Sequence, residues 1–128
     1  MNSLFDGESN QSLMNFDQNK VKAWVGIDPG ADGGIACIDI NGQTKKWVMP
    51  HNANGIEILE LVKILDDLKD QYSVTLILED VHSIFGTSAK SNFSFGFTCG
   101  AINAIVVTRL LKLLPVQPKA WQKVIWAN

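Results

Sequence analysis

The sequence has little that would suit a secreted or membrane-spanning protein. Its 128 residues include only two cysteines, and no apolar run approaches the roughly 18 residues that cross a bilayer. Cys37 and Cys99 lie far apart within apolar segments, which favours buried, reduced thiols over a disulfide framework. Residues 1–20 are polar and acidic and lack the apolar segment of a signal peptide. These absences predict a cytoplasmic protein.

The sequence also lacks a surplus of basic residues. Eleven Lys and Arg residues stand against 13 Asp and Glu residues, for a formal net charge of −2. Domains that bind nucleic acid usually carry a basic excess. Here the negative charge falls within residues 1–20, so the rest of the chain is neutral. Because bound metal ions also carry positive charge, this balance does not exclude a metal-dependent enzyme that acts on DNA.

The length and the 46% hydrophobic content suit one domain with a buried core. Residues 1–19 are rich in Asn, Ser, Gln and Asp, which predicts a flexible leader. A short helix docked on the body is the alternative for this segment. Residues 20–128 are expected to form the folded domain.

Apolar runs bounded by turn residues predict an α/β fold with a mixed five-stranded sheet. Strands expected at residues 21–27, 34–40 and 44–49 form an antiparallel meander. Asn41-Gly42 predicts a tight primed turn with positive φ at both residues. Further strands are predicted at 75–78 and 113–116, and the former is apolar enough to be buried on both faces and paired in parallel.

Helical periodicity predicts three helices, at residues 55–71, 93–111 and 119–127, the last of them behind Pro118. A polar loop is predicted over residues 81–92, between the fourth strand and the second helix. The apolar stripe of the first helix comprises Ile56, Leu59, Val62, Leu65 and Leu68, with Ile64 one position out of register.

The second predicted helix is broadly apolar. Its apolar residues are Phe93, Phe97, Ile102, Ile105, Val106 and Leu110. Small residues recur every four positions, at Gly96, Gly100 and Ala104, and such a stripe allows the close approach of another element. The stripe suits either packing against the sheet or contact with a second copy of the helix.

Two of the predicted strands end in acidic residues. The run Trp24 to Ile27 stops at Asp28, before Pro29, and the strand at 75–78 runs into Glu79 and Asp80. A right-handed crossover would lay these strands side by side and parallel, with Asp28 and Glu79 at the same end.

Carboxylates without His or Cys partners suit Mg²⁺ or Mn²⁺. Two such ions about 4 Å apart would activate a water and stabilise the leaving oxygen of a phosphodiester. Asp28 is expected to bridge the ions and Glu79 to be the second ligand. Asp80 ranks lower, because it points to the opposite face if the strand continues. The alternative is that these acids are ordinary turn residues or helix caps.

Four segments together resemble the RuvC family of Holliday-junction resolvases, particularly those of phages. They are Gly26-Ile27-Asp28-Pro29-Gly30, the Leu-Ile-Leu-Glu run ending at Glu79, Phe95-Gly96 to Val107, and Pro118 to Lys123. The resemblance covers residues 22–126. It implies a ribonuclease H-like fold, a homodimer formed through the 93–111 helix, and metal-dependent cutting of four-way or branched DNA junctions, in the host cytoplasm if a phage encodes the protein. Asp28 matches the family's first-strand catalytic aspartate, and Glu79 matches its glutamate on the fourth strand.

The resemblance also implies DNA contacts in the segment after the glutamate. Well-studied members stack an aromatic residue on DNA there. His82 holds the corresponding place and Phe85 follows it, although Phe85 suits a loop anchor equally well. Ser88, Lys90 and Asn92 are candidate phosphate contacts, with an ordinary polar loop as the alternative.

Further candidates for DNA contact, Lys119 and Lys123, lie near the end of the chain. Trp121 stands between them and is more typical of a core residue.

This sequence departs from the family in one respect. The family completes its site with an Asp, paired with another Asp or a His, on a C-terminal helix, whereas this sequence ends at Asn128. We therefore expect a truncated form with weak or absent nuclease activity. The alternatives are a non-catalytic junction-binding or structural module, a YqgF-like relative acting on RNA, and a half-domain of the actin-like kinase superfamily.

Overall fold

The computed structural model describes residues 19–80 and 86–127. Its elements follow in the order β1 (Val21–Asp28), β2 (Gly34–Asp39), β3 (Thr44–Val48), β4 (His51–Asn52), β5 (Gly55–Ile56), α2 (Ile58–Gln71), β6 (Tyr72–Glu79), α3 (Ala89–Thr108), β7 (Lys112–Val116) and α4 (Pro118–Trp126). The predicted leader falls almost wholly outside the described residues.

Five strands form one mixed sheet in the order β3-β2-β1-β6-β7. β1, β2 and β3 pair antiparallel, as the predicted meander requires, and β6 lies parallel to both β1 and β7. The predicted mixed five-stranded α/β fold is therefore confirmed. The parallel placement of β6 beside β1, which the crossover rule predicted, is confirmed as well.

The turn between β2 and β3 is not the primed turn that Asn41-Gly42 predicted. Gly42 has a φ of 83°, but Asn41 does not have a positive φ. Instead, the carboxylate of Asp39 accepts hydrogen bonds of 2.9 Å from the backbone N–H groups of Asn41 and Gln43. An Asp side chain that binds the backbone of its own turn stabilises a wider connection.

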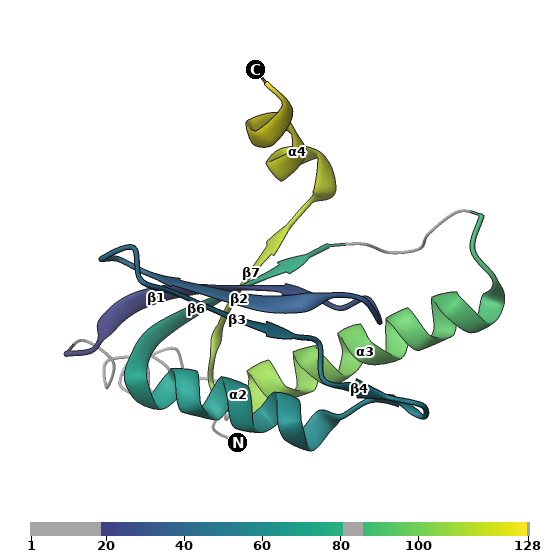
Figure 1. The fold of residues 1–128 in the computed structure, drawn as a ribbon, viewed down its shortest axis with the longest axis horizontal. Helices are drawn as coiled ribbons and strands as arrows, with labels where there is room; N and C mark the ends of the chain where they lie inside the picture. Colours follow the sequence, from purple (N-terminus) through teal and green to yellow (C-terminus); the bar gives the residue numbers. More distant parts are fainter. Residues whose placement is uncertain (1–18, 81–85, 128) are drawn as a thin grey trace, which may run out of the picture.

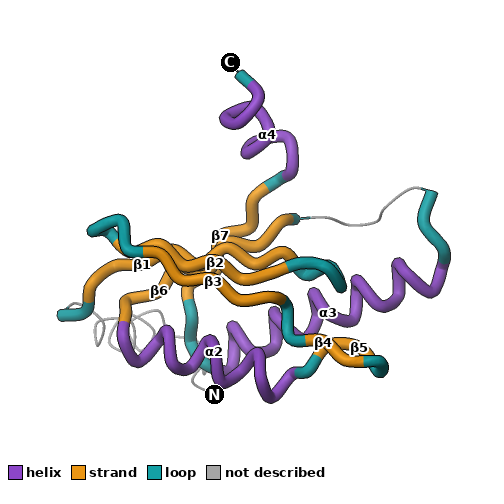
Figure 2. Tube along the Cα trace, in the orientation of Figure 1, coloured by secondary structure: helices purple, strands orange, loops and turns teal. Residues whose placement is uncertain are grey.

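The two long helices cover the same face of the sheet. Figure 1 shows α2 and α3 beneath the sheet and α4 projecting from the opposite side, and Figure 2 shows the same layers by element type. On the other face, Trp24, Ile38 and Leu114 are exposed. The strand at 75–78 is thus buried on one face only in the described part of the chain, and the prediction of two buried faces is wrong there. No helix among these residues is long and apolar enough to cross a membrane.

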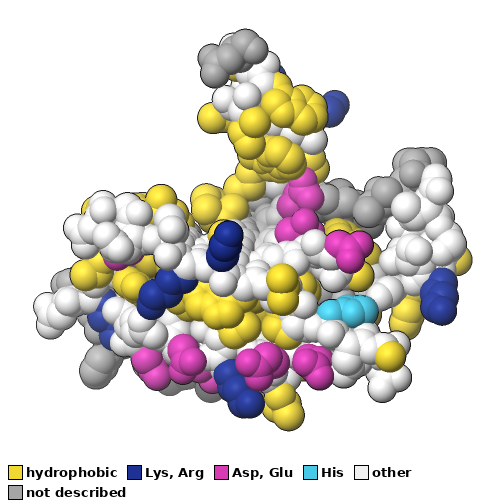
Figure 3. Space-filling view, viewed as in Figure 1, with side chains coloured by type: hydrophobic (Ala, Val, Ile, Leu, Met, Phe, Trp, Pro, Cys, Tyr) yellow, Lys and Arg dark blue, Asp and Glu magenta, His cyan; other side chains and the backbone are white. Residues whose placement is uncertain are grey.

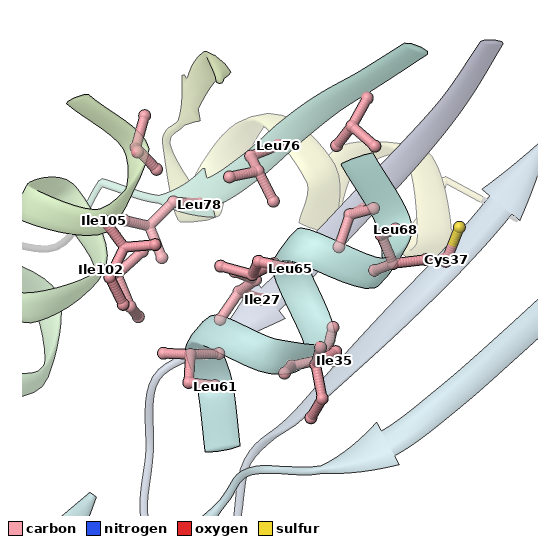
Figure 4. Packing of buried hydrophobic residues seen from close by; sticks show 14 of the residues in the cluster. Ile27, Ile35, Cys37, Leu61, Leu65, Leu68, Leu76, Leu78, Ile102 and Ile105 are labelled. Carbon is pink, nitrogen blue, oxygen red and sulfur yellow. The ribbon is translucent and has the colours of Figure 1, made fainter. Parts of the chain in front are cut away.

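The core lies between the sheet and these two helices. Ile27, Leu65, Leu76 and Ile102 are buried and come from four different elements (Figure 4). Burial removes the apolar surface of each such side chain from contact with water. This layer therefore supplies most of the driving force for folding.

The two cysteines differ in their surroundings. Cys37 is buried in β2 as predicted, whereas Cys99 is only half-buried on α3, so that part of the prediction is wrong. Both are free thiols. Burial raises the pKa of both thiols above their ordinary value, because a thiolate is poorly solvated in the interior. Both groups therefore remain protonated near neutral pH.

The buried stripe of α2 differs from the predicted one. Leu61, Ile64, Leu65 and Leu68 are buried, whereas Leu59 is exposed. Ile64, which did not fit the predicted register, belongs to the true stripe. The helix also begins at Ile58, because Gly55 and Ile56 pair with His51 and Asn52 in a small hairpin that was not predicted.

The second long helix begins earlier than predicted. α3 starts at Ala89, where Ser88 caps it: the Ser88 Oγ accepts a hydrogen bond of 3.1 Å from the Ser91 N–H. Lys90 and Asn92, predicted in a loop, therefore belong to its first turns. Only Thr98, Ile102, Ile105 and Val106 of this helix are buried. The apolar residues Phe93 and Phe97 are exposed, and Leu110 lies beyond the helix end at Thr108.

Replacing Leu61 with alanine tests this packing. Leu61 is 0% exposed and Leu59 is 79% exposed, although the two lie on the same helix. We expect Leu61→Ala to lower the free energy of unfolding by about 2–5 kcal/mol, because it leaves a cavity. The matched control, Leu59→Ala, should change it by no more than about 0.5 kcal/mol. Urea denaturation of both variants measures the difference, and equal losses would contradict the assigned helix face.

Candidate metal centre at the strand ends

Asp28 is the last residue of β1 and lies at the carboxyl end of the strand. Its side chain is exposed, while the neighbouring Ile27 and Pro29 are buried. The Asp28 Oδ1 accepts a hydrogen bond of 3.0 Å from the Gly30 N–H. The turn that ends the strand thus fixes one oxygen of the carboxylate and leaves the group facing solvent.

Glycine at position 33 allows this turn to close. The Gly33 N–H donates a hydrogen bond of 2.9 Å to the Gly30 carbonyl. A Cβ atom at position 33 would lie 2.2 Å from the Asp28 carbonyl oxygen and 2.8 Å from the Gly30 carbonyl oxygen. Real Cβ atoms do not approach backbone so closely, so a side chain here would displace the turn that holds Asp28.

Glu79 is the last residue of β6, directly beside Asp28. In the parallel pairing of the two strands, Ile27 lies opposite Leu78, which makes Asp28 and Glu79 neighbours at the strand ends. Alternate residues of a strand face opposite sides of a sheet. Ile27 and Leu78 are both buried against the helices, so Asp28 and Glu79 share the other face. Adjacent strands lie about 4.8 Å apart, a spacing at which two carboxylates can share a cation.

Asp80 follows Glu79 directly and lies one residue beyond the end of β6. Its backbone N–H donates a hydrogen bond of 2.9 Å to the Val116 carbonyl, so the pairing of β6 with β7 continues through this residue. Strand alternation then directs Asp80 toward the helix-covered face. The register therefore favours Asp28 and Glu79 as the pair and supports the lower rank of Asp80.

The donor set at the strand ends consists of oxygen atoms. Glu79 Oε1 accepts a hydrogen bond of 3.0 Å from the Trp121 Nε1–H, so each carboxylate has one oxygen bound to a protein donor. Within residues 19–80 and 86–127, no cluster of three or more His, Cys, Asp or Glu side chains forms a ready-made metal centre. Mg²⁺ is often held by only one or two carboxylates, with water and substrate phosphates as its other ligands. The pair fits such an ion.

A cavity of about 510 Å³ adjoins the end of β1. Pro29 and Gly30, which follow Asp28, form part of its wall, and Lys90 and Ser91 of α3 form another part. His51 of the small hairpin also lines it. Lys90 is exposed at this hollow, whereas Ser88 is engaged as the helix cap and Asn92 donates its backbone N–H to the Ser88 carbonyl at 3.0 Å. Of the three candidate phosphate contacts, only Lys90 carries a positive charge, and it lies at the wall of this cavity.

The two basic residues predicted near the end of the chain are exposed on α4. Lys119 and Lys123 lie four residues apart, so they share one face of the helix. Figure 3 shows acidic side chains (magenta) at the foot of the projecting α4. His82 and Phe85 lie outside the described residues. Trp121 is not the core residue that the sequence suggested, because it is exposed and bonded to Glu79. No pattern in the sequence signals that contact.

The small-residue stripe of α3 faces away from the sheet. Gly96, Gly100 and Ala104 are exposed, and a Cβ atom built on either glycine would meet nothing within 4 Å. Phe97 and Val107 are exposed beside them. Packing among residues 19–80 and 86–127 therefore does not require small residues at these positions, and the prediction that the stripe packs against the sheet is wrong.

No protein-family model and no curated protein matches this chain. Among solved structures, it is similar to Thermus thermophilus RuvC in complex with a Holliday junction substrate, with a TM-score of 0.51 and 15% identity over 83% of this chain and 71% of that one. The chain has the ribonuclease H-like fold of RuvC. A second Thermus thermophilus RuvC structure matches at a TM-score of 0.47 and 15% identity, over 79% of this chain and 67% of that one. The match at a TM-score of 0.51 confirms the RuvC-like fold that the sequence motifs implied.

Gly33→Ala tests the turn that holds Asp28. We expect this variant to lower the free energy of unfolding by about 1–3 kcal/mol, the usual cost of forcing atoms into a filled space. Gly26→Ala is the matched control, since a Cβ at Gly26, within the strand that ends at Asp28, meets no described residue within 4 Å. Urea denaturation of both variants measures the effect. Equal stability of the two would show that the turn differs from the one described.

Proposed function

We propose that this chain is a RuvC-like endonuclease that acts on four-way or branched DNA with the help of Mg²⁺ or Mn²⁺. The observation that carries the proposal is the parallel register of β1 and β6, in which Ile27 lies opposite Leu78, so that Asp28 and Glu79 follow at the carboxyl ends of adjacent strands. The likeness of the fold to a RuvC structure solved with a Holliday junction supports it. Membership of the RuvC family is part of the same proposal.

Asp28 and Glu79 would hold the cation, each with the carboxylate oxygen that accepts no hydrogen bond from residues 19–80 and 86–127. Asp80 is a less favoured ligand. The hydrogen bond from the Gly30 N–H restrains Asp28, so the carboxylate would need little reorganisation when the cation binds. When bound, the cation would polarise the scissile phosphate and stabilise the charge that develops on it.

The DNA would lie across the open end of the sheet. Lys90 at the cavity and Lys119 and Lys123 on α4 are exposed and supply positive charge on either side of the strand ends. Contacts of this kind go to backbone phosphates, so they position the substrate without reading its sequence. Ser88, Asn92, His82 and Phe85 remain further candidates in the same region.

Asp28→Asn and Glu79→Gln test the metal centre. We expect the wild-type chain to bind Mn²⁺ and to cut a synthetic four-way junction slowly. Loss of a residue that only bonds to a metal ligand typically lowers metal affinity or activity 10–100-fold. Each of these variants removes a ligand itself, so we expect a larger loss of Mn²⁺ affinity and of cutting rate. Mn²⁺ affinity is measured by electron paramagnetic resonance and cutting on denaturing gels.

Asp70→Asn is the control for these variants, because it removes an exposed carboxylate of α2 that takes no part in the site. Cutting that survives Asp28→Asn would overturn the proposal. Binding of the junction without any cutting by the wild-type chain would favour the non-catalytic junction-binding module instead.

We further propose that two copies associate through the exposed face of α3. Phe93, Phe97 and Val107 expose apolar surface there, beside the glycine stripe. Apolar surface gathered in this way on one helix is typical of a protein–protein contact. Small residues within it allow two helix backbones to approach closely. A dimer would present two metal centres to the two strands that a junction exchanges.

Phe97→Arg tests the dimer. Phe97 is 53% exposed, so the substitution leaves the monomer intact but places a charge in the proposed contact. We expect the wild-type chain to sediment as a dimer and the variant to dissociate at least tenfold more readily, since burying an unpaired charge costs more than 1.4 kcal/mol. Leu59→Arg, on the exposed face of α2, should leave the dimer unchanged. A wild-type chain that sediments as a monomer would contradict the proposal.

A further inference from the structure

Trp121 connects α4 to the carboxylate of Glu79. Its indole Nε1–H donates a hydrogen bond of 3.0 Å to the Glu79 Oε1. The side chain is 40% exposed, and no residue of α4 is buried. Packing in a core therefore does not explain where this tryptophan lies, and the polar contact is its most specific interaction.

The chain path brings these two residues together. β7 pairs in parallel with β6 so that Val116 lies opposite Glu79, and α4 begins two residues later at Pro118. Proline at the first helical position presets the backbone for this immediate start. Side chains of a helix tilt toward its N-terminus, so Trp121, in the first turn, extends back toward the end of β6.

The chemistry of the pair suits orientation of the carboxylate. An indole N–H is a donor only and offers a single hydrogen bond. It satisfies Oε1 and leaves Oε2 for another ligand. Hydrogen-bonded partners of metal-binding carboxylates fix the ligand's orientation in this way, and their loss typically costs 10–100-fold in metal affinity or activity.

We propose that Trp121 is a positioning residue for Glu79, which holds the carboxylate ready to bind a divalent cation. The role of Glu79 as a ligand rests on the proposed function, whereas the contact itself does not. The same bond fixes the helix that carries Lys119 and Lys123. Binding of the cation and placement of these basic residues are thus coupled through one side chain.

A purely structural role for Trp121, as an anchor of α4, is the alternative. Trp121→Phe separates the two roles, because phenylalanine keeps an aromatic ring but lacks the donor. Trp121→His restores a ring N–H and is the rescue variant. Trp126→Phe is the matched control, since Trp126 lies on the same helix and is 73% exposed.

The first measurement uses the full chain without metal. In the ¹⁵N-labelled protein, the four tryptophans give four indole N–H resonances, and Trp121→Phe identifies the one that belongs to Trp121. We expect Glu79→Gln to shift this resonance and to leave that of Trp126 unchanged. A Trp121 resonance that does not respond to Glu79→Gln would overturn the inference, whatever the metal does.

The second measurement is Mn²⁺ affinity by electron paramagnetic resonance. We expect Trp121→Phe to weaken binding about tenfold, Trp121→His to recover most of the loss, and Trp126→Phe to have no effect. Unchanged affinity in Trp121→Phe would overturn the positioning role. The positioning role would also be overturned if Trp121→His did not recover the lost Mn²⁺ affinity and the α4 amide resonances shifted. That result would indicate that Trp121 only anchors α4.

The two measurements separate failure of this inference from failure of the proposed function. A wild-type chain that binds no Mn²⁺ overturns the metal centre and, with it, the role of Trp121 in positioning a ligand. The indole resonance then still decides whether Trp121 and Glu79 are in contact. A chain that binds Mn²⁺ through Asp28 and Glu79, with an affinity that does not depend on Trp121, keeps the proposed function and ends the inference.

Discussion

The parallel pairing of β1 with β6 is the interaction on which the rest of the structure depends. It joins two segments that are far apart in the sequence and buries Val25 and Leu76 beneath α2 and α3. Strand side chains alternate with a period of two, so the register that buries these residues also fixes the face on which Asp28 and Glu79 lie. A slip of one residue in either strand would place one carboxylate in the apolar core, where an unpaired charge is strongly disfavoured. Core packing and the geometry of the strand ends are therefore set by the same register.

The two faces of the sheet differ: one packs against helices and forms the core, and the other is accessible to solvent. α2 and α3 cover one face and hold the described core, while the strand ends open toward the side from which α4 projects (Figure 1). A carboxylate on the covered face would pay a desolvation cost before it met any ligand. Asp28 is exposed and Glu79 is half-buried, so both avoid that cost. The one-sided arrangement of the helices thus explains why the acids at these two positions remain available to a solute.

The sequence predicted the strands and their arrangement correctly where a strong local pattern coincides with a topological rule. The apolar runs that end at Asp28 and Glu79 gave both strands, and the handedness of the crossover gave their adjacency. Prediction from the sequence failed where tertiary contacts decide. Leu59 and Leu61 are equally apolar, and only the angle at which α2 meets the sheet determines which of them is buried. Likewise, Asn41-Gly42 is a strong signal for a primed turn, but the Asp39 side chain bonds to the turn and selects another geometry.

The contact between Trp121 and Glu79 could not be predicted from the sequence, because it depends on tertiary structure. The two residues are 42 positions apart, and the bond between them depends on how β7 registers against β6. β7 contributes no acidic residue to the strand ends, yet its pairing determines where α4 begins and hence where the indole lies. Strand β6 thus has an acidic neighbour from β1 on one side and a hydrogen-bond donor from beyond β7 on the other. Since both neighbours are held by backbone pairing, a shift of β1 or of β7 along β6 would alter the surroundings of Glu79 without a substitution at any residue.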